Sequence, residues 1–174
     1  MKNTIALIGF MGSGKTTVGS KLIKMYHDFK LIDTDSEIEK RSGRSISEIF
    51  ATDGEQAFRQ MEIDLLKSIS ENDTNKYVLS TGGGMPINKE CGKILVENTF
   101  VVYLYADVDI LYERLKYDTE RPLLQKGDKR EIIASLYSAR HDIYKSEADM
   151  VVDTSNITVE NVVMTIMEAF RNLQ

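Results

Sequence analysis

The sequence has very little cysteine or proline and no tryptophan, since its 174 residues include only one cysteine and two prolines. A single cysteine, Cys91, excludes an intramolecular disulfide, and no histidine or other cysteine lies near it at the spacing of a metal site. Long hydrophobic runs are missing too, because the longest unbroken one, residues 100–106, is far too short to cross a bilayer. We therefore expect neither a disulfide scaffold nor a membrane protein, but a soluble protein of the reducing cytoplasm.

Positive charge is in deficit, with 22 Lys and Arg against 27 Asp and Glu and a net charge of -5. No basic field therefore covers the surface for non-specific binding of nucleic acid, and any site for anions must be local. With 42% hydrophobic residues, the chain can bury a core. No Ser/Gly-rich linker and no repeat marks a boundary, so we expect a single domain over residues 1–174.

Five short runs rich in Ile, Val, Leu and Tyr predict strands, and segments with helical periodicity separate most of them. The runs are 4–8, 30–32, 77–79, 100–105 and 150–152, and the helical patterns are clearest at 18–25, 58–69 and 159–170. Ser45 and Glu48 form a capping-box pattern that predicts a further short helix. Strands that alternate with helices predict an α/β fold, with a parallel sheet covered by helices on both faces.

The strongest motif follows the first predicted strand. Residues 9–16 read GFMGSGKT and match G-x-x-x-x-G-K-[ST] at every fixed position. Glycines let such a loop turn its amides toward one point, where they and the dipole of the next helix stabilise phosphate oxygens. Lys15 would reach the β and γ phosphates, and Thr16 would place its hydroxyl on a magnesium ion. The alternative is a plain glycine-rich turn, which the preceding strand and the following helix make the weaker interpretation.

A P-loop protein usually holds its magnesium ion with a further aspartate at the end of another strand. The third predicted strand lacks one, since it ends in Ser80 and Thr81. Asp33 and Asp35 follow the second strand at its carboxyl end, the edge at which open α/β sheets bind ligands. If that strand continues through Asp35, both side chains share one face. Alone, the pair is better explained as loop or helix-capping aspartates; beside a P-loop, a metal site is favoured.

Six motifs stand in order along nearly the whole chain, and together they resemble the shikimate kinases. The P-loop alone marks only a superfamily, whereas the combination of the other motifs is specific. The motifs are the P-loop at 9–16, Asp33-x-Asp35, Phe58-Arg59-x-x-Glu62, Gly82-Gly83-Gly84, Arg121-Pro122-Leu123-Leu124 and Arg140-x-x-x-Tyr144.

The resemblance implies an enzyme of aromatic amino-acid biosynthesis that transfers the γ-phosphoryl group of ATP to the 3-hydroxyl of shikimate, with Mg²⁺ as cofactor. It implies a three-layer P-loop kinase architecture, in which the five-stranded parallel sheet has the order 2-3-1-4-5. The core would comprise residues 1–33, 76–115 and 130–174, with a substrate-binding segment at about 34–62 and a lid at about 116–129. By the same analogy, the protein would be a cytoplasmic monomer without nucleic-acid or membrane partners.

On the nucleotide side, the resemblance implies that Lys15 acts in catalysis. Arg121 matches the lid arginine that closes over the phosphates, and Arg114 matches the arginine that stacks on adenine. Thr16 and Asp33 match the residues that hold the metal ion, Asp33 often through water. The implied ATP-binding residues are Gly12, Ser13, Gly14, Lys15, Thr16, Thr17, Arg114 and Arg121.

On the acceptor side, Arg59 and Arg140 match the two arginines that hold the shikimate carboxylate. The chemistry agrees, because a planar guanidinium can bond both oxygens of a carboxylate at once. Asp35 matches the aspartate that bonds the shikimate hydroxyls; it is also the candidate base, although positioning could be its whole task. The glycine triplet suits the same pocket, because a backbone without Cβ can approach a polyol closely. The implied substrate-binding residues are Asp35, Arg59, Gly82, Gly83, Gly84 and Arg140.

Two other functions share part of this pattern. A gluconate or nucleoside monophosphate kinase has the P-loop and the lid, but not the Arg59 motif together with the glycine triplet. A GTPase switch carries Asn-Lys-x-Asp, and the nearest match, residues 88–91, ends in Cys91. His27 and His141 are expected at the surface, and Cys91 is expected to be buried or half-buried and inert. The polar composition of 116–129 predicts a segment that buries little and moves.

Overall fold

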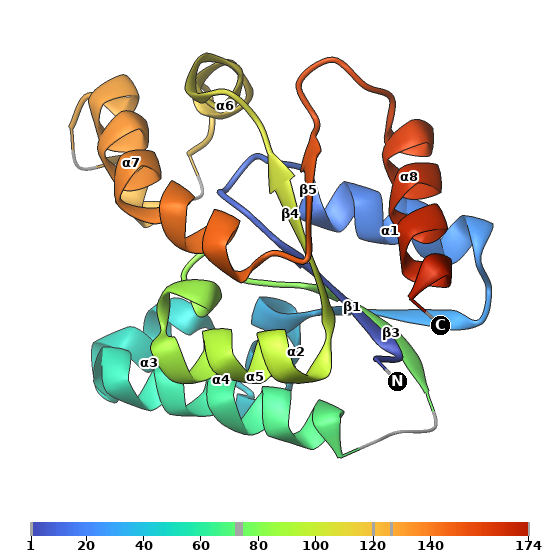
Figure 1. Ribbon diagram of the computed structural model, residues 1–174. Helices are drawn as coiled ribbons and strands as arrows, with labels where there is room; N and C mark the ends of the chain where they lie inside the picture. Colours follow the sequence, from blue (N-terminus) through green and yellow to red (C-terminus); the bar gives the residue numbers. More distant parts are fainter. Residues whose placement is uncertain (1, 72–74, 120, 126, 174) are drawn as a thin grey trace.

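A parallel sheet lies at the centre of the structure, a computed structural model that describes residues 2–71, 75–119, 121–125 and 127–173. Within these residues, five strands form one sheet in the order β2-β3-β1-β4-β5 (Figure 1). All five predicted strands are confirmed to within one residue at each end, and so is the order that the resemblance implied. The strands are β1 (Thr4–Ile8), β2 (Phe29–Asp33), β3 (Lys76–Ser80), β4 (Phe100–Tyr105) and β5 (Met150–Asp153).

Helices cover both faces of the sheet, as the alternating pattern predicted. The helices α1 (Lys15–Met25) and α8 (Val159–Asn172) lie side by side on one face (Figure 1). The remaining helices pack on the opposite side and around its edge. They are α2 (Thr34–Ser42), α3 (Ile46–Thr52), α4 (Gly54–Ser70), α5 (Lys89–Asn98), α6 (Val108–Leu115) and α7 (Lys129–Glu147), with the 3₁₀ helices η1 (Met85–Ile87) and η2 (Pro122–Gln125).

The central strand β1 is buried on both faces, and its side chains divide alternately between two hydrophobic cores. Ile5 and Leu7 pack toward α1 and α8. Ala6 and Ile8 face the other core, which α4, α5 and α7 close. All four side chains are 0% exposed. A strand apolar on both faces belongs in the middle of a covered parallel sheet, which places the following P-loop at the centre of the sheet's carboxyl edge.

The second strand does not continue through Asp35. The carboxylate of Asp33 accepts a hydrogen bond from the Ser36 amide, at 3.3 Å, and so caps α2, which begins at Thr34. The expectation that Asp33 and Asp35 share a strand face is therefore wrong, because the cap turns the chain into a helix one residue earlier. The predicted capping box is confirmed: Ser45 and Glu48 exchange both bonds at the start of α3.

Residues 116–129 connect α6 to α7, and Glu120 and Lys126 of this segment lie outside the described residues. The segment is anchored at more points than its polar composition predicted. Leu124, in η2, is 0% exposed and belongs to the main core. The ammonium of Lys129 donates to the backbone carbonyls of Lys116, at 3.0 Å, and Asp118, at 2.6 Å. The segment is therefore held to the rest of the structure at Leu124 and Lys129.

The two histidines differ in their environment. His27 is exposed, as predicted. His141 is half-buried: its ring stacks on Tyr137, and its Nδ1 lies 2.9 Å from the Tyr103 hydroxyl, so the prediction of a surface histidine is wrong. Cys91 is fully buried, as expected, and forms no disulfide; burial raises the pKa of its thiol to about 12. Across the described residues, the helices fall short of the length and hydropathy that crossing a membrane requires.

Candidate active site

The loop from β1 to α1 is shaped by backbone angles that only glycine adopts easily. Gly12 and Gly14 have φ values of 79° and 95°, in the left-handed region. Gly9 has φ 143°, and a Cβ there would lie 2.6 Å from the carbonyl oxygen of Leu104 on β4. These glycines let the loop curl over the start of α1, with Ser13, Gly14, Thr16 and Thr17 around the helix N-terminus, where amides and the helix dipole favour anions.

Lys15 is buried beneath this loop. Its ammonium donates to the carbonyls of Gly9 and Phe10, both at 2.9 Å. Burial, with the nearby charge of Arg121, lowers the pKa of Lys15 to about 8, against the opposing effect of Asp35 and Asp33. The lysine thus bonds to carbonyls of its own loop. Phosphate oxygens would be stronger partners for the same ammonium than these neutral carbonyls.

Three oxygen-bearing side chains meet where β2 and β3 end. The Thr16 hydroxyl donates to Asp33 Oδ2 at 3.1 Å, and the Ser80 hydroxyl donates to the same oxygen at 3.0 Å. The hydroxyls of Thr16 and Ser80 lie 3.0 Å apart. The other oxygen of Asp33 caps α2, so the carboxylate is fixed at both ends. A cluster of hard oxygen donors fits a divalent cation such as Mg²⁺.

Ser80 is a member of this cluster that the sequence did not indicate. The sequence shows only that β3 ends without a carboxylate, which does not by itself give the hydroxyl of Ser80 a role. The parallel pairing of β2 and β3 places Asp33 opposite Ser80, which explains the contact. A polar residue ending the strand that pairs with the Asp33 strand was the available signal.

Asp35 lies in the first turn of α2, half-buried against the glycine triplet. A Cβ on Gly82 would lie 2.5 Å from Asp35 Oδ1, so no larger residue fits there without moving the carboxylate. Burial raises the pKa of Asp35, and the charge of Asp33 adds to the effect, while Lys15 opposes it. Thr34 reinforces the arrangement, because its hydroxyl accepts a hydrogen bond from the Gly82 amide at 3.0 Å. Asp35 is therefore held beside both Lys15 and the Asp33 cluster.

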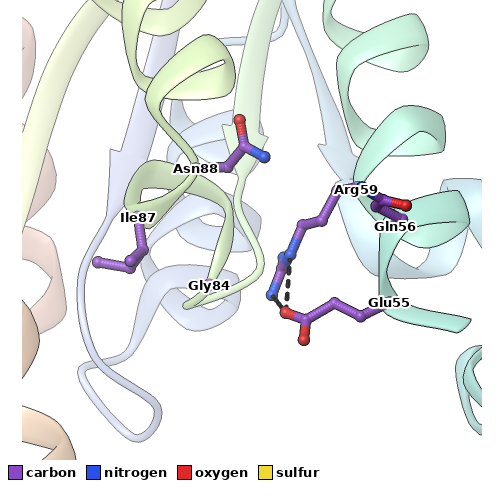
Figure 2. A pocket seen from close by; sticks show the side chains of 6 residues that line it. All are labelled: Glu55, Gln56, Arg59, Gly84, Ile87 and Asn88. Carbon is purple, nitrogen blue, oxygen red and sulfur yellow. Dashed lines mark hydrogen bonds and ion pairs between the residues drawn. The ribbon is translucent and has the colours of Figure 1, made fainter.

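Arg59, on α4, lies on the other side of the glycine triplet. A Cβ on Gly84 would lie 2.9 Å from Arg59 Nη2, so the guanidinium lies almost directly on the backbone. An open pocket of about 400 Å³ surrounds it (Figure 2). Phe58 packs inward, at 5% exposed, whereas its neighbour Arg59 lines the pocket. The lining residues are Glu55, Gln56, Arg59, Gly84, Ile87 and Asn88.

Two glutamates flank Arg59, and the sequence analysis gave neither a role. Glu62, 1% exposed, accepts from Arg59 Nη1 at 2.7 Å. Burial raises the pKa of Glu62 to about 7, against the opposing effect of Arg59. Glu55 accepts from Arg59 Nε at 3.3 Å and from Nη2 at 3.1 Å. The available signal was spacing, because residues three and four apart on a helix are neighbours.

Arg140 reaches the glycine triplet through Tyr144 on the same helix, α7. The Tyr144 hydroxyl donates to the Gly83 carbonyl at 2.6 Å, and this tyrosine is 0% exposed. Burial raises the pKa of Tyr144, while the adjacent Arg140 opposes the effect. Arg140 is half-buried and is not among the residues that line the Arg59 pocket. The structure thus brings Arg59 and the Arg140–Tyr144 pair to different members of the same triplet.

The two remaining arginines lie on the nucleotide side. Arg114 donates from Nη1 to the Gly12 carbonyl at 2.9 Å and from Nη2 to the Thr154 carbonyl at 3.1 Å, which ties the P-loop to the loop after β5. Arg121 is exposed, and its Nε donates to Asp118 at 3.0 Å. Its charge already reaches Lys15, whose pKa it lowers. In this conformation Arg121 is therefore near the P-loop but bonded within its own segment.

Comparisons with known proteins agree with this geometry. A family model described as shikimate kinase matches residues 11–171. The shikimate kinase of Caldicellulosiruptor bescii is 45% identical over 160 residues, which is 92% of this chain and 90% of that protein. A solved shikimate kinase from Acinetobacter baumannii, in complex with shikimate, superposes with a TM-score of 0.88 at 31% identity, covering 98% of this chain and 94% of that one. That from Aquifex aeolicus superposes with a TM-score of 0.80 at 38% identity, covering 97% and 96%.

Proposed function

The chain belongs to the shikimate kinase family, and from this we propose how its own residues divide the work of the family reaction. The reaction transfers the γ-phosphoryl group of ATP to the 3-hydroxyl of shikimate, giving shikimate 3-phosphate and ADP. One observation carries the proposal: Lys15, the Thr16–Asp33–Ser80 cluster and Asp35 meet at one edge of the sheet, with the Arg59 pocket beyond Gly82.

We propose that the P-loop binds the phosphates of ATP through the backbone amides around the N-terminus of α1. Lys15 leaves the carbonyls of Gly9 and Phe10 and bonds the β and γ phosphates, where its charge stabilises the transferring group. Thr17, exposed in the first turn of α1, is proposed to bond the phosphates as well. Arg114 stacks on adenine from a position fixed by its bonds to both adjoining loops. The proposed set is Gly12, Ser13, Gly14, Lys15, Thr16, Thr17, Arg114 and Arg121.

Shikimate kinases use a divalent metal ion, and we propose that here it is Mg²⁺. Thr16 and Asp33 hold it, and Ser80 fixes the orientation of the Asp33 carboxylate. The oxygen-only donor set supports this choice, because Mg²⁺ prefers a few protein oxygens and takes the rest from phosphate and water. When bound, the ion neutralises negative charge on the phosphates during transfer.

On the acceptor side, we propose that Arg59 and Arg140 hold the shikimate carboxylate, while the backbone of Gly82, Gly83 and Gly84 lies against the ring. Asp35 bonds the acceptor hydroxyl and takes its proton as the phosphoryl group arrives. Its raised pKa supports this role, since a carboxylate with a higher proton affinity is a better base. Lys15 beside it keeps the carboxylate ionised between turnovers.

Two segments of the single domain complete the proposal. Residues 34–62 form the substrate-binding segment, which carries Asp35 and Arg59, and 116–129 form the lid. Closure exchanges the Asp118 partner of Arg121 for the phosphates of ATP and excludes water from the transferring group. The lid turns about the points at which Leu124 and Lys129 are anchored.

We also propose that the enzyme acts as a cytoplasmic monomer, without nucleic-acid or membrane partners. An unpaired buried cysteine and a net charge of -5 support this assignment. Light scattering after size exclusion, in the presence and absence of ATP, tests it: a mass of two or more chains would contradict the monomer.

The experiment that tests the function measures ADP release by the purified protein with magnesium-ATP. Shikimate, gluconate and nucleoside monophosphates are compared as acceptors. Among these acceptors, we expect only shikimate to give a large rate of ADP release. ADP release that depends on one of the other acceptors would overturn the assignments of Asp35, Arg59 and Arg140, while leaving the P-loop assignment intact.

A further inference from the structure

The guanidinium that is proposed to receive the acceptor carboxylate already holds two carboxylates of the protein. Glu55 Oε1 accepts from both Nε and Nη2 of Arg59, and Glu62 Oε2 accepts from Nη1. With both glutamates ionised, the formal charge of this group is -1. Because burial raises the pKa of Glu62 to about 7, the net charge of the group at neutral pH lies between -1 and 0, so it offers an incoming carboxylate no net attraction while both glutamates remain on Arg59.

The two glutamates are not equivalent. Glu62 is 1% exposed and sits behind the guanidinium, where it can move little, whereas the Glu55 side chain is 66% exposed. Glu55 also lines the pocket that opens beside Arg59, and Figure 2 shows its carboxylate against the guanidinium. Only Glu55 can leave Arg59 at the small cost of breaking an exposed ion pair, because solvent screens that contact.

We propose that Glu55 is a gate residue: its carboxylate occupies the guanidinium of Arg59 before the acceptor binds, and the acceptor carboxylate must displace it. The inference rests on the proposed function, in which Arg59 binds the carboxylate of shikimate. It adds a specificity-determining residue that makes no favourable contact with the substrate. A polyol without a negative charge cannot compete for the guanidinium and leaves the gate closed.

The proposal makes an unusual prediction about the direction in which acceptor affinity changes when Glu55 loses its charge. If Glu55 merely oriented Arg59, removing its charge would weaken acceptor binding. If it competes for Arg59, removing its charge strengthens acceptor binding. Glu55→Gln separates the two, because the amide keeps the length of the side chain and an oxygen that can still accept from the guanidinium, while the charge is lost.

The test compares Glu55→Gln with wild type by calorimetric titration of shikimate without ATP, and by steady-state kinetics. We expect the Kd and the KM for shikimate to fall by about threefold, the range of an exposed ion pair. The KM for ATP should not change. Asp64→Asn is the matched control, since it removes the same charge from an exposed position of α4, where the carboxylate accepts a hydrogen bond from Gln60; it should leave both constants unchanged.

Two further measurements separate failure of the gate from failure of the proposed site. Arg59→Ala must weaken shikimate binding. If it does not, Arg59 is not the carboxylate site, and the proposal for Glu55 is overturned as well. If Arg59→Ala weakens binding but Glu55→Gln also weakens it or leaves it unchanged, the site stands and the gate is wrong.

The methyl ester of shikimate supplies the last comparison, because it lacks the negative charge. We expect Glu55→Gln to leave binding of the ester unchanged while it tightens binding of shikimate. Equal tightening of both would show that Glu55 acts through the shape of the pocket, and would overturn competition for Arg59.

Discussion

The nucleotide side and the acceptor side of this site are built in opposite ways. On the proposed nucleotide side, residues 9–16 offer backbone amides and one buried lysine, in a loop fixed by the angles of its own glycines. The acceptor pocket depends on charged side chains from α2, α4 and α7, brought to the glycine triplet by the fold. A site made of backbone has few alternative states, whereas one made of paired charges can exchange partners. We therefore expect changes on the nucleotide side to affect kcat and changes on the acceptor side to affect KM.

The largest effect is expected from the lid arginine. Arg121→Ala removes the charge proposed to move from Asp118 onto the transferring phosphoryl group. Arginines in this role contribute about 10³- to 10⁵-fold in rate. Steady-state kinetics with saturating ATP and shikimate should show a kcat lower by that range, with the Kd for shikimate little changed. A kcat within about threefold of wild type would remove Arg121 from the reaction.

Asp35 lies between the two sides of the site, and its replacement tests whether it acts in catalysis or only in acceptor binding. General-base catalysis contributes about 10²- to 10⁴-fold, so we expect Asp35→Asn to lose activity in that range, nearly as much as Asp35→Ala. The amide keeps the hydrogen bond to the acceptor hydroxyl but cannot take its proton. An asparagine variant as active as wild type would leave only the positioning role and assign Asp35 to binding.

Arg59 should affect binding of one substrate alone. Arg59→Ala removes two charge-assisted hydrogen bonds to the acceptor carboxylate, which predicts a KM for shikimate higher by about 30-fold or more. The KM for ATP should stay within about twofold, because the P-loop is built separately. A parallel rise in both constants would show that the two sides are not independent.

The smallest effect is expected on stability. Glu147, at the end of α7, lies against Gly92. Burial raises the pKa of Glu147 from 4.5 to about 7, and among the described residues its Oε2 has no hydrogen-bond partner. The folded chain therefore holds this proton more tightly than the unfolded chain, and stability falls as pH rises from 4.5 to about 7.

The glutamine of Glu147→Gln is neutral at every pH. The free energy of unfolding of this variant should therefore be about 1 kcal/mol higher than that of wild type near pH 8 and equal to it near pH 4. Urea denaturation at the two pH values measures the difference. An equal gain at both would exclude titration of Glu147 as the cause. Glu62 has the same raised pKa but is paired with Arg59, so its replacement by glutamine should affect acceptor binding as well.

The nucleotide side could be predicted from the sequence because its signals are local. Residues 9–16 contain the whole loop, and the apolar runs placed all five strands. The strand order and the acceptor residues came from resemblance to a family, since neither follows from periodicity. The roles of individual site residues remain predictions for the experiments above.

What escaped prediction depends on tertiary contacts. Ser80 joins the Thr16–Asp33 cluster only because β3 pairs with β2, and His141 is half-buried only because α7 packs its ring against tyrosines from β4. The break between Asp33 and Asp35 was missed for a different reason. Alternation and helix capping compete at the same residues, and the hydrogen bond from Ser36 to Asp33 decides for the helix.

The bond from Tyr144 to Gly83 has an optical consequence. With no tryptophan in the chain, ultraviolet emission comes from its eight tyrosines. Tyr144 touches the acceptor loop, and the ring of Tyr103 lies 5.4 Å from its own ring. Tyrosine fluorescence depends on the hydrogen bonding of the phenol, so the enzyme carries its own reporter of the acceptor pocket. We therefore expect shikimate binding to change the tyrosine emission, which would follow it without a label or a coupled assay.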